Sequence, residues 1–306
     1  MIHMRKLRTP IVLLLAIVIS CISRERYLCG RGQVVIDALR SKRCWVISAP
    51  NRRRATLAKL LGDDEYRHVE QIHVPREVAV QPEHITAFPG LTTFVAFANV
   101  DVNAGSLRAL FRHPRINEID LRDANITMPD ESFARVFRDI DFRAAEIRNL
   151  YFTDSRLGDR ELLRLADISN LESLDISDTS VTAAGNSSLQ RCPRLKTLGI
   201  DRISVDRSMV VSLSSLRSLQ ILSLDHTHIG DDNVQQLCRS LPELRVLSLE
   251  GTRVTRESLP DFAKAELLNY VNLADTSVVA NDLNGIDGTN RKIFRLTDVD
   301  VVTGDR

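Results

Sequence analysis

Aliphatic residues recur along this chain about every 24 residues, in segments that read aliphatic-x-x-aliphatic-x-aliphatic. Well-formed segments begin at Ile116, Ile147, Leu171, Leu195, Leu219, Leu244 and Leu268, and weaker ones begin at Val69, Thr92 and Arg291. Alternation of apolar and other residues is typical of a half-buried strand. A register held over so many segments predicts a row of similar units, each starting with a short strand.

Pairs of apolar residues three positions apart follow most of these strands, for example Leu162 with Leu165 and Val234 with Leu237. This spacing suits a short helix with one face turned inward. Burying about five Leu-sized side chains stabilises a unit by about 8–15 kcal/mol. Ordering about 24 residues costs roughly 30–50 kcal/mol. Each strand–turn–helix unit is therefore expected to fold only when stacked against its neighbours.

The ninth position of a unit, counted from its first aliphatic residue, carries a hydroxyl in five units, whereas Ala124 and Ile203 break the pattern. The five residues are Ser155, Thr179, Thr227, Thr252 and Thr276. The repeats resemble the leucine-rich repeat family, in its bacterial variant with a ribonuclease-inhibitor-like shape. That resemblance implies an α/β solenoid, a right-handed horseshoe with a parallel sheet on the concave face and short helices on the convex face. In the family, the ninth side chain bonds backbone groups of the adjacent turn, which a hydroxyl can do.

The step from Ile116 to Ile147 is longer than the others and contains an insertion. Residues 129–140 begin with Pro129 and acidic residues, and they place Phe133, Val136, Phe137 and Ile140 on one helical face. Proline and acids are favoured in the first turn of a helix. The insertion is interpreted either as a longer helix on the convex face or as a docking element.

Residues 1–23 form a separate hydrophobic segment, in which Arg5, Lys6 and Arg8 precede thirteen apolar or small residues. This length suits the core of a signal peptide better than a full membrane span, which needs about 20 residues. The segment ending at Cys21 also resembles the lipobox of bacterial lipoproteins. A cleaved signal, a lipid anchor at Cys21 and an uncleaved N-terminal hydrophobic helix all stay open. Each places the bulk of the chain outside the cytoplasm, in a bacterial envelope; the alternative is a cytoplasmic protein.

Residues 24–68 are expected to form a basic linker and a helical cap, with helices near residues 33–39 and 54–61, before a repeat domain at residues 69–306. A solenoid needs a cap over its first apolar layer. Residues 1–60 hold 13 Lys and Arg against 2 Asp and Glu, whereas the rest of the chain has a net charge of −10. A basic start beside a hydrophobic segment favours an anionic membrane surface. The acidic repeats argue against nucleic acid as a partner.

Catalytic and cofactor-binding motifs are not found in the sequence, so neither an enzyme nor a cofactor is expected. His226 and His228 could meet one metal ion on an extended segment, but they lack a fixed third ligand. Cys29 and Cys44 either pair as a disulfide in an oxidising compartment or stay free. Cys192 falls at a position that is aliphatic in other units, so it is expected to be a core residue.

The concave face of such a solenoid is the remaining candidate for function. Alternate strand residues point to it, and they form an acidic stripe with few cations. The residues expected to contact a basic or polar protein partner are Asp120, Tyr151, Asp175, Asp201, Asp225 and Glu250. Acids on strands about 4.7–4.9 Å apart repel one another within a Debye length of about 8 Å, so a cationic partner is favoured. The alternative is a solvated face that keeps the sheet soluble.

The leading interpretation is therefore a non-enzymatic interaction scaffold at the cell envelope. Two others are a substrate-recruiting adaptor of a ubiquitin-ligase or effector type, and the recognition part of an enzyme complex. The adaptor would need a recruiting domain, for which residues 24–68 hold too little apolar helix. The enzyme would need a catalytic domain outside the repeats. Neither the partner's identity nor the oligomeric state can be read from the sequence.

Overall fold

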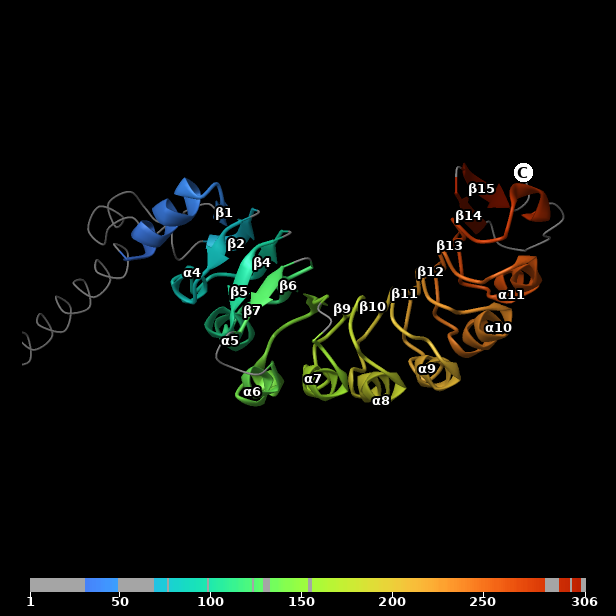
Figure 1. Cartoon of the computed structure of the whole chain (residues 1–306), viewed down its shortest axis with the longest axis horizontal. Coiled ribbons are helices and arrows are strands. Elements are labelled where there is room, and N and C mark those ends of the chain that lie inside the picture. Colours follow the sequence, from blue (N-terminus) through green and yellow to red (C-terminus); the bar gives the residue numbers. More distant parts are fainter. Residues whose placement is uncertain are drawn as a thin grey trace, which may run out of the picture.

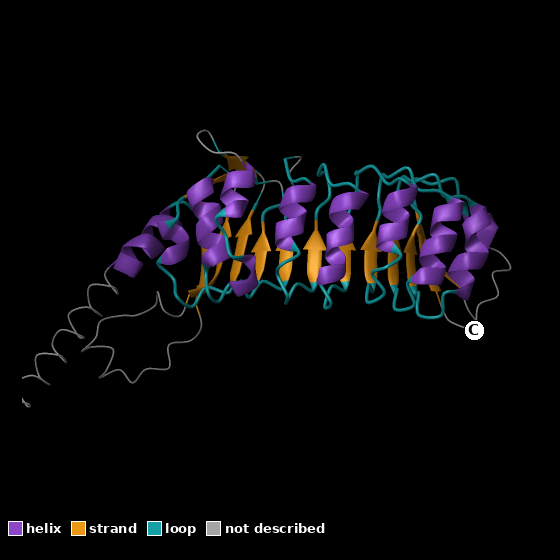
Figure 2. Ribbon diagram, turned by 90° about the horizontal axis from the view of Figure 1, so that it is seen from below, coloured by secondary structure: helices purple, strands orange, loops and turns teal. Residues whose placement is uncertain are grey.

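The structure is a computed structural model that describes residues 31–48, 69–75, 77–97, 99–122, 124–128, 133–153, 156–283, 292–297 and 299–303. Strands line the inner side of an arch and helices line its outer side (Figure 1). Seen from below, the helices form one layer that covers the strands (Figure 2). The expected two-layer α/β arrangement, with strands inside and helices outside, is confirmed.

The inner layer is a sheet of twelve strands, in which one strand comes from each repeat and one further strand closes each end. Its strands, in spatial order, are β1 (Trp45–Ser48), β2 (Val69–Val74), β4 (Thr93–Ala96), β6 (Glu118–Asp120), β8 (Asn149–Tyr151), β9 (Ser173–Asp175), β10 (Thr197–Gly199), β11 (Ile221–Ser223), β12 (Val246–Ser248), β13 (Tyr270–Asn272), β14 (Lys292–Leu296) and β15 (Val299–Thr303). A smaller parallel sheet contains β3 (Ala79–Val80), β5 (Asp101–Asn103) and β7 (Asn125–Thr127).

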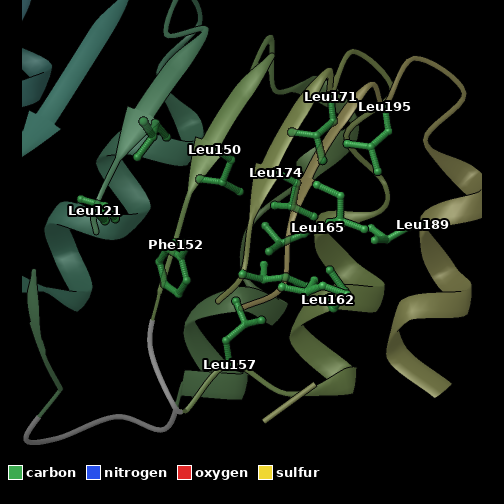
Figure 3. Close-up of a cluster of buried hydrophobic side chains, with 14 of the residues drawn as sticks. Leu121, Leu150, Phe152, Leu157, Leu162, Leu165, Leu171, Leu174, Leu189 and Leu195 are labelled. Atoms are coloured by element: carbon green, nitrogen blue, oxygen red, sulfur yellow. The ribbon is translucent and has the colours of Figure 1, made fainter. Parts of the chain in front are cut away.

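The middle residue of each repeat strand points into the core and lies beside its equivalents in the next repeats. Leu174, Leu198, Leu222 and Leu247 pair in one parallel register, and all four are fully buried. Figure 3 shows part of this core, where Leu150 and Leu174 lie above helix residues Leu162 and Leu165. The stacked apolar spine predicted from the repeats is confirmed.

The outer layer consists of short helices, many of which end after one or two turns. Residues 31–41 are helical, followed by α4 (Glu83–Thr86), α5 (Ala104–Arg112), α6 (Phe133–Arg138), η1 (Phe142–Ala144), α7 (Asp159–Leu165), α8 (Ala183–Asn186), η2 (Ser187–Arg191), α9 (Arg207–Leu213), α10 (Asp231–Ser240), η3 (Arg256–Ser258), α11 (Leu259–Lys264) and η4 (Ala280–Leu283). Thr182 and Asp206 cap α8 and α9 by accepting hydrogen bonds from backbone N–H groups of the first turn.

The insertion supplies a helix of the outer layer, α6. Its apolar face is buried: Phe133 is 9% exposed and Phe137 is 1% exposed. These two rings lie 4.9 Å apart, and they pack against Phe111, Phe142 and Phe152 with ring centroids 5.5–6.1 Å apart. The insertion therefore supplies a convex helix, as expected, but α6 is only six residues long where a longer helix was predicted. Its apolar face is occupied by the core rather than free to dock.

Two details differ from the sequence prediction. The second repeat begins at Leu91 instead of Thr92, because Phe94 pairs with core residues Ile72 and Ile119. The signal was hidden because Phe replaces the expected aliphatic residue. The cap also contains more than helices, since β1 pairs antiparallel with β2, as β15 does with β14 at the other end.

The N-terminal expectations fall mostly outside the described residues. The helix expected near residues 33–39 is confirmed, whereas the hydrophobic helix within residues 1–23 and the helix near residues 54–61 lie outside the part that the structure describes. Within the described ranges, no helix has the length and apolar character needed to cross a membrane.

Candidate partner-binding face

The six candidate contact residues lie on one face of the main sheet. Asp120, Tyr151 and Asp175 are the last residues of β6, β8 and β9, next to the core residue of each strand. Asp201, Asp225 and Glu250 each lie two residues beyond β10, β11 and β12. All six side chains are partly exposed. The structure therefore brings together the whole predicted set, on the concave side.

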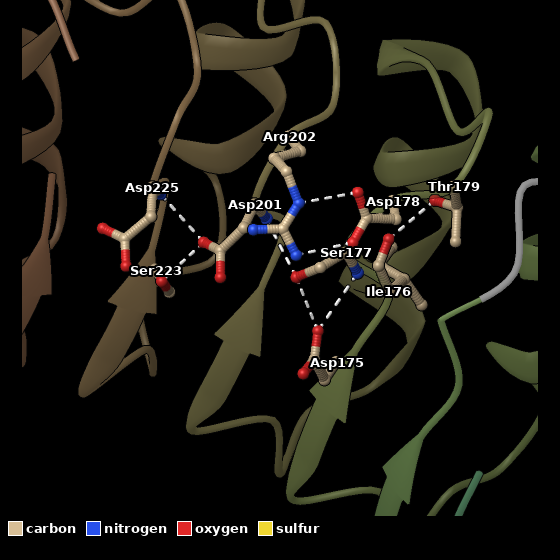
Figure 4. Close-up of polar contacts among 9 residues, drawn as sticks. All are labelled: Asp175, Ile176, Ser177, Asp178, Thr179, Asp201, Arg202, Ser223 and Asp225. Atoms are coloured by element: carbon tan, nitrogen blue, oxygen red, sulfur yellow. Dashed lines mark hydrogen bonds and ion pairs between the residues drawn. The ribbon is translucent and has the colours of Figure 1, made fainter. Parts of the chain in front are cut away.

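Several of these acids also hold the repeats together. Asp201 accepts hydrogen bonds at Oδ1 from the backbone N–H of Asp225 (2.8 Å) and from the Ser223 hydroxyl (2.5 Å). Asp225 in turn accepts from the backbone N–H of Glu250 at 2.7 Å. Part of this chain of bonds is drawn in Figure 4. We call it the concave ladder: the bonds in which a side-chain oxygen accepts the backbone N–H of the seventh residue of a repeat.

Two kinds of acceptor occur in the concave ladder. Where the fifth residue of the same repeat has a carboxylate or amide, that side chain accepts the bond; this holds for Asp120, Asp175 and Asn272. Where the fifth residue is Gly199, Ser223 or Ser248, the seventh residue of the preceding repeat accepts instead, and these acceptors are Ser177, Asp201 and Asp225. The acidic stripe therefore follows partly from the need to satisfy backbone donors.

This role could have been found in the sequence. The signal is a small fifth residue preceded, one repeat earlier, by a short oxygen-bearing seventh residue, as in Ser177 before Gly199 and Asp201 before Ser223. Reading each repeat separately hides it, because the donor and the acceptor are about 24 residues apart.

Two arginines lie in the stripe, in keeping with the expectation of few cations. Arg122 forms a two-point ion pair with Asp120, at 2.7 Å and 3.1 Å, and its guanidinium lies 4.6 Å from the centroid of the Tyr151 ring. Arg202 pairs in the same way with Asp178, at 2.6 Å and 2.7 Å, and it lowers the pKa of the Asp178 carboxyl. The Asp120 end of the stripe is thus already neutralised.

The middle of the stripe keeps its negative charge. Among the described residues, no Lys or Arg forms an ion pair with Asp175, Asp201, Asp225 or Glu250, although Arg202 interacts electrostatically with Asp201 and Asp175. His226 Nε2 lies 4.0 Å from Glu250. Burial raises the pKa of Asp201, and the neighbouring charges of Asp225 and Asp175 raise it further. The carboxylates in this part of the face therefore repel one another.

The chain leaves each strand through a corner in the left-handed backbone region. The eighth residues Asp178, Arg202, His226 and Asp275 have φ between 53° and 58°. Gly251, with φ 64°, occupies the equivalent corner, where an added Cβ would come within 2.3 Å of the His226 ring. A positive φ strains most residues but is tolerated by Asp and His more than by others, and by Gly freely.

Hydroxyls at the ninth position fasten these corners. Thr179, Thr227, Thr252 and Thr276 donate to the carbonyl three residues earlier, at 2.6–2.7 Å. The bond to a backbone group is confirmed, although its acceptor lies at the end of the same repeat's own strand. Ser155 lies outside the described residues.

The candidates for other chemistry have structural positions. Cys192 is buried, as expected, and burial raises the pKa of its thiol to about 11. Cys44 is a buried free thiol, whereas Cys29 lies outside the described residues. Within the described part of the chain, no group of three or more His, Cys, Asp or Glu residues is placed to hold a metal ion, and this includes His226 and His228.

Comparison with known proteins gives only distant structural likenesses. No protein-family model matches the chain, and no curated protein matches it. Solved structures similar to it include internalin C2 from Listeria monocytogenes, with 17% identity, a TM-score of 0.43, and coverage of 76% of this chain and 83% of that one. A Bacteroides fragilis protein has 14% identity, a TM-score of 0.48, and coverage of 76% of this chain and 74% of that one.

These likenesses are too distant to transfer a function. The fold follows from the chain itself, in which one strand per repeat pairs in parallel with the next from β2 to β14 and a helical layer covers the opposite side (Figure 2). By its repeat length, its stacked aliphatic core and its sheet, the chain has the fold of a leucine-rich-repeat solenoid.

Proposed function

We propose that the chain is a non-enzymatic scaffold that binds a basic polypeptide segment on the concave face of its main sheet. The observation that carries the proposal is the row formed by Asp175, Asp201, Asp225 and Glu250, which come from four consecutive repeats and form no Lys or Arg ion pair within the described residues. A cationic segment would supply the missing counter-charges.

Electrostatics favours such a partner. Neighbouring strands lie about 4.8 Å apart, so consecutive acids are closer than the Debye length of about 8 Å at physiological salt. Their mutual repulsion contributes to the raised pKa of Asp201. Lys or Arg side chains lying over the row would relieve this repulsion, and the association would weaken as salt is added.

The residues at the ends of the row have other roles in the proposal. Asp120 is already paired with Arg122, and Tyr151 is covered by the same guanidinium. This group presents a flat, nearly neutral surface for polar and stacking contacts. At Gly199 the Asp175 carboxylate fills the space that a side chain would occupy, because an added Cβ would come within 2.8 Å of it.

A test must remove charge without breaking the concave ladder. The triple variant D175N/D201N/D225N keeps an acceptor oxygen at each position, since Asn has one amide oxygen. The matched control E243Q/E257Q/E266Q removes three charges from exposed residues that precede β12 or lie among the convex helices. The full-length chain is used to select binders from a display library of random peptides.

The selected peptides are expected to be rich in Lys and Arg, to bind the control variant like the original chain, and to bind the triple Asn variant roughly tenfold or more weakly at low salt. Selected peptides that lack basic residues, or that bind the triple variant equally well, would contradict the proposal.

The proposal also places the scaffold at the bacterial cell envelope, with residues 1–23 as an export signal or anchor. The support is the sequence pattern of basic residues before an apolar stretch. Cell fractionation, with mass spectrometry of the mature amino terminus, distinguishes cleavage, lipidation at Cys21 and retention. An intact, unmodified amino terminus on a protein found only in the cytosol would rule this placement out.

A further inference from the structure

Large apolar side chains gather at the first three strands of the concave face, beside Gln71 and His73 of β2, in contrast to the acidic middle. Trp45, Ile47 and Phe97 are 67%, 45% and 44% exposed. We define the N-terminal apolar patch as these three residues together with His73 and Val95. Large apolar side chains gathered on a surface, unlike single scattered ones, mark interaction sites in soluble proteins.

The strand register places this patch on the concave side. Ile72 and Phe94 are fully buried, so their neighbours His73 and Val95 point to the opposite face. Trp45 lies directly across from His73 in the antiparallel β1–β2 pair. The His73 ring lies 6.3 Å from the Trp45 ring and 6.3 Å from the Phe97 ring, measured between centroids. Trp45, His73 and Phe97 therefore form one continuous aromatic row across three strands.

The patch is continuous with the acidic stripe. Strand β4 pairs directly with β6, so that Val95 lies opposite Asp120 and Thr93 lies opposite Glu118. From β1, the strand order places β9 five strands away and β12 eight strands away. At about 4.8 Å per strand these separations are roughly 24 Å and 38 Å. An extended peptide, at about 3.3 Å per residue, crosses them in roughly 7 to 12 residues.

We infer that the N-terminal apolar patch is a subsite of the concave face that takes an aliphatic or aromatic side chain of the same basic polypeptide segment. The inference rests on the proposed function and adds a sequence pattern for the bound segment. The bound segment carries an apolar anchor over Trp45 and Phe97, and its Lys or Arg residues follow or precede the anchor by roughly 7 to 12 positions.

A protein segment suits this patch better than a membrane. Strands β1, β2 and β4 lie on the inner side of the arch (Figure 1), and a flat bilayer surface makes poor contact with side chains that point to this inner side. Glu118 adjoins it through Thr93 and would repel anionic lipid headgroups. An extended segment running across the strands can meet both the apolar and the acidic parts at once.

Trp45 provides a direct readout, because it is the chain's single tryptophan. Peptides selected on the full-length chain, about 16 residues long so that they can span roughly 38 Å, are titrated while Trp45 emission is followed. Binding is expected to shift the emission to shorter wavelength as the ring leaves water. The variant I47S/F97S keeps Trp45 and is expected to bind roughly tenfold or more weakly. The control V211S/V279S removes two equally apolar side chains, each 56% exposed, that lie outside the sheet.

The outcomes separate this inference from the proposed function. Peptides that bind I47S/F97S normally, or leave Trp45 emission unchanged, but lose affinity for D175N/D201N/D225N would overturn the patch and keep the basic-peptide scaffold. Loss of affinity in both variants supports both. Two further results would overturn the patch: an emission shift produced by phosphatidylglycerol vesicles and abolished in I47S/F97S, or a shift that depends only on protein concentration and marks self-association.

Discussion

Asp201 tests whether the concave ladder stabilises the solenoid, because its acceptor and its charge can be removed separately. Its Oδ1 accepts the Asp225 N–H and the Ser223 hydroxyl. In D201A both donors lose their acceptor, whereas D201N keeps an amide oxygen in place. Neither variant carries a charge at residue 201. The difference in unfolding free energy between D201A and D201N therefore isolates the acceptor.

The size of this difference follows from the burial of the donors. A buried N–H without a partner costs about 1–3 kcal/mol. Asp225 and Ser223 are partly exposed, so water can replace some of the lost bonding. We expect D201A to be less stable than D201N by about 1–2 kcal/mol. D201S should lie between them, since Ser177 at the equivalent position already accepts the Asp201 N–H at 2.9 Å.

The charge of Asp201 acts in the opposite direction. Its pKa is raised in the folded state, first by burial, so the folded chain binds a proton more readily than the unfolded chain does. The carboxylate therefore destabilises the fold at neutral pH, and this cost is relieved as pH falls through the folded pKa toward the ordinary value of 3.8. D201N should be more stable than the original chain at pH 7, and its advantage should shrink as the solution is acidified.

The assay is urea unfolding followed by far-UV circular dichroism. The m-values, which are the slopes of unfolding free energy against urea concentration, are compared as well, because repeat arrays can unfold in parts. E243A serves as the control, since it removes one exposed acid from the turn before β12. Equal unfolding free energies of D201A and D201N, with unchanged m-values, would refute the structural role of the concave ladder.

The other predictions concern the packing and the buried titratable groups. Gly185→Ala should destabilise the chain by about 1–3 kcal/mol, because its Cβ would come within 2.9 Å of the Asp159 backbone. Gly230→Ala, with nothing within 4 Å, should cost less in the same urea unfolding assay. Native thiol labelling read by peptide mass spectrometry should modify the partly exposed Cys238 before Cys192, whose pKa is about 11; equal rates would contradict the buried position. Burial lowers the pKa of His113, so its contribution to stability is present above about pH 6.5 and is lost as pH falls toward the folded pKa. His113→Gln should therefore flatten this part of the plot of unfolding free energy against pH. An unchanged plot would contradict this role of His113.

The stacked core could be predicted because its determinants lie within one repeat. An aliphatic residue such as Leu174 or Leu222 is buried whatever its neighbours are, provided that the units stack. The predicted start of a repeat was wrong only for the repeat that begins at Leu91, where Phe94 takes the place of an aliphatic core residue. The end strand β1 was missed because the cap has no repeat to align, although its Trp-Val-Ile run has strong strand propensity.

The sequence predicted where the candidate face lies, but not which hydrogen bonds and ion pairs its side chains form. Alternation along the strands places Asp175, Asp201 and Asp225 on the concave side. Their partners, however, depend on the length of side chains in adjacent repeats, as when Asp201 reaches a donor because Ser223 is short. Pairing of Arg202 with Asp178, which lies 24 residues earlier, likewise appears only when the strands are in register.

The concave face as the binding surface is tested most directly by photo-crosslinking from matched positions on the two faces. Ile221 on β11 is 40% exposed beside the acidic row, and Val211 on α9 is 56% exposed in the helical layer. With p-benzoylphenylalanine in place of Ile221, selected basic peptides should crosslink to the chain, and excess unlabelled peptide should suppress the product. With the same residue in place of Val211 they should not. Equal or stronger crosslinking from Val211 would contradict binding on the concave face.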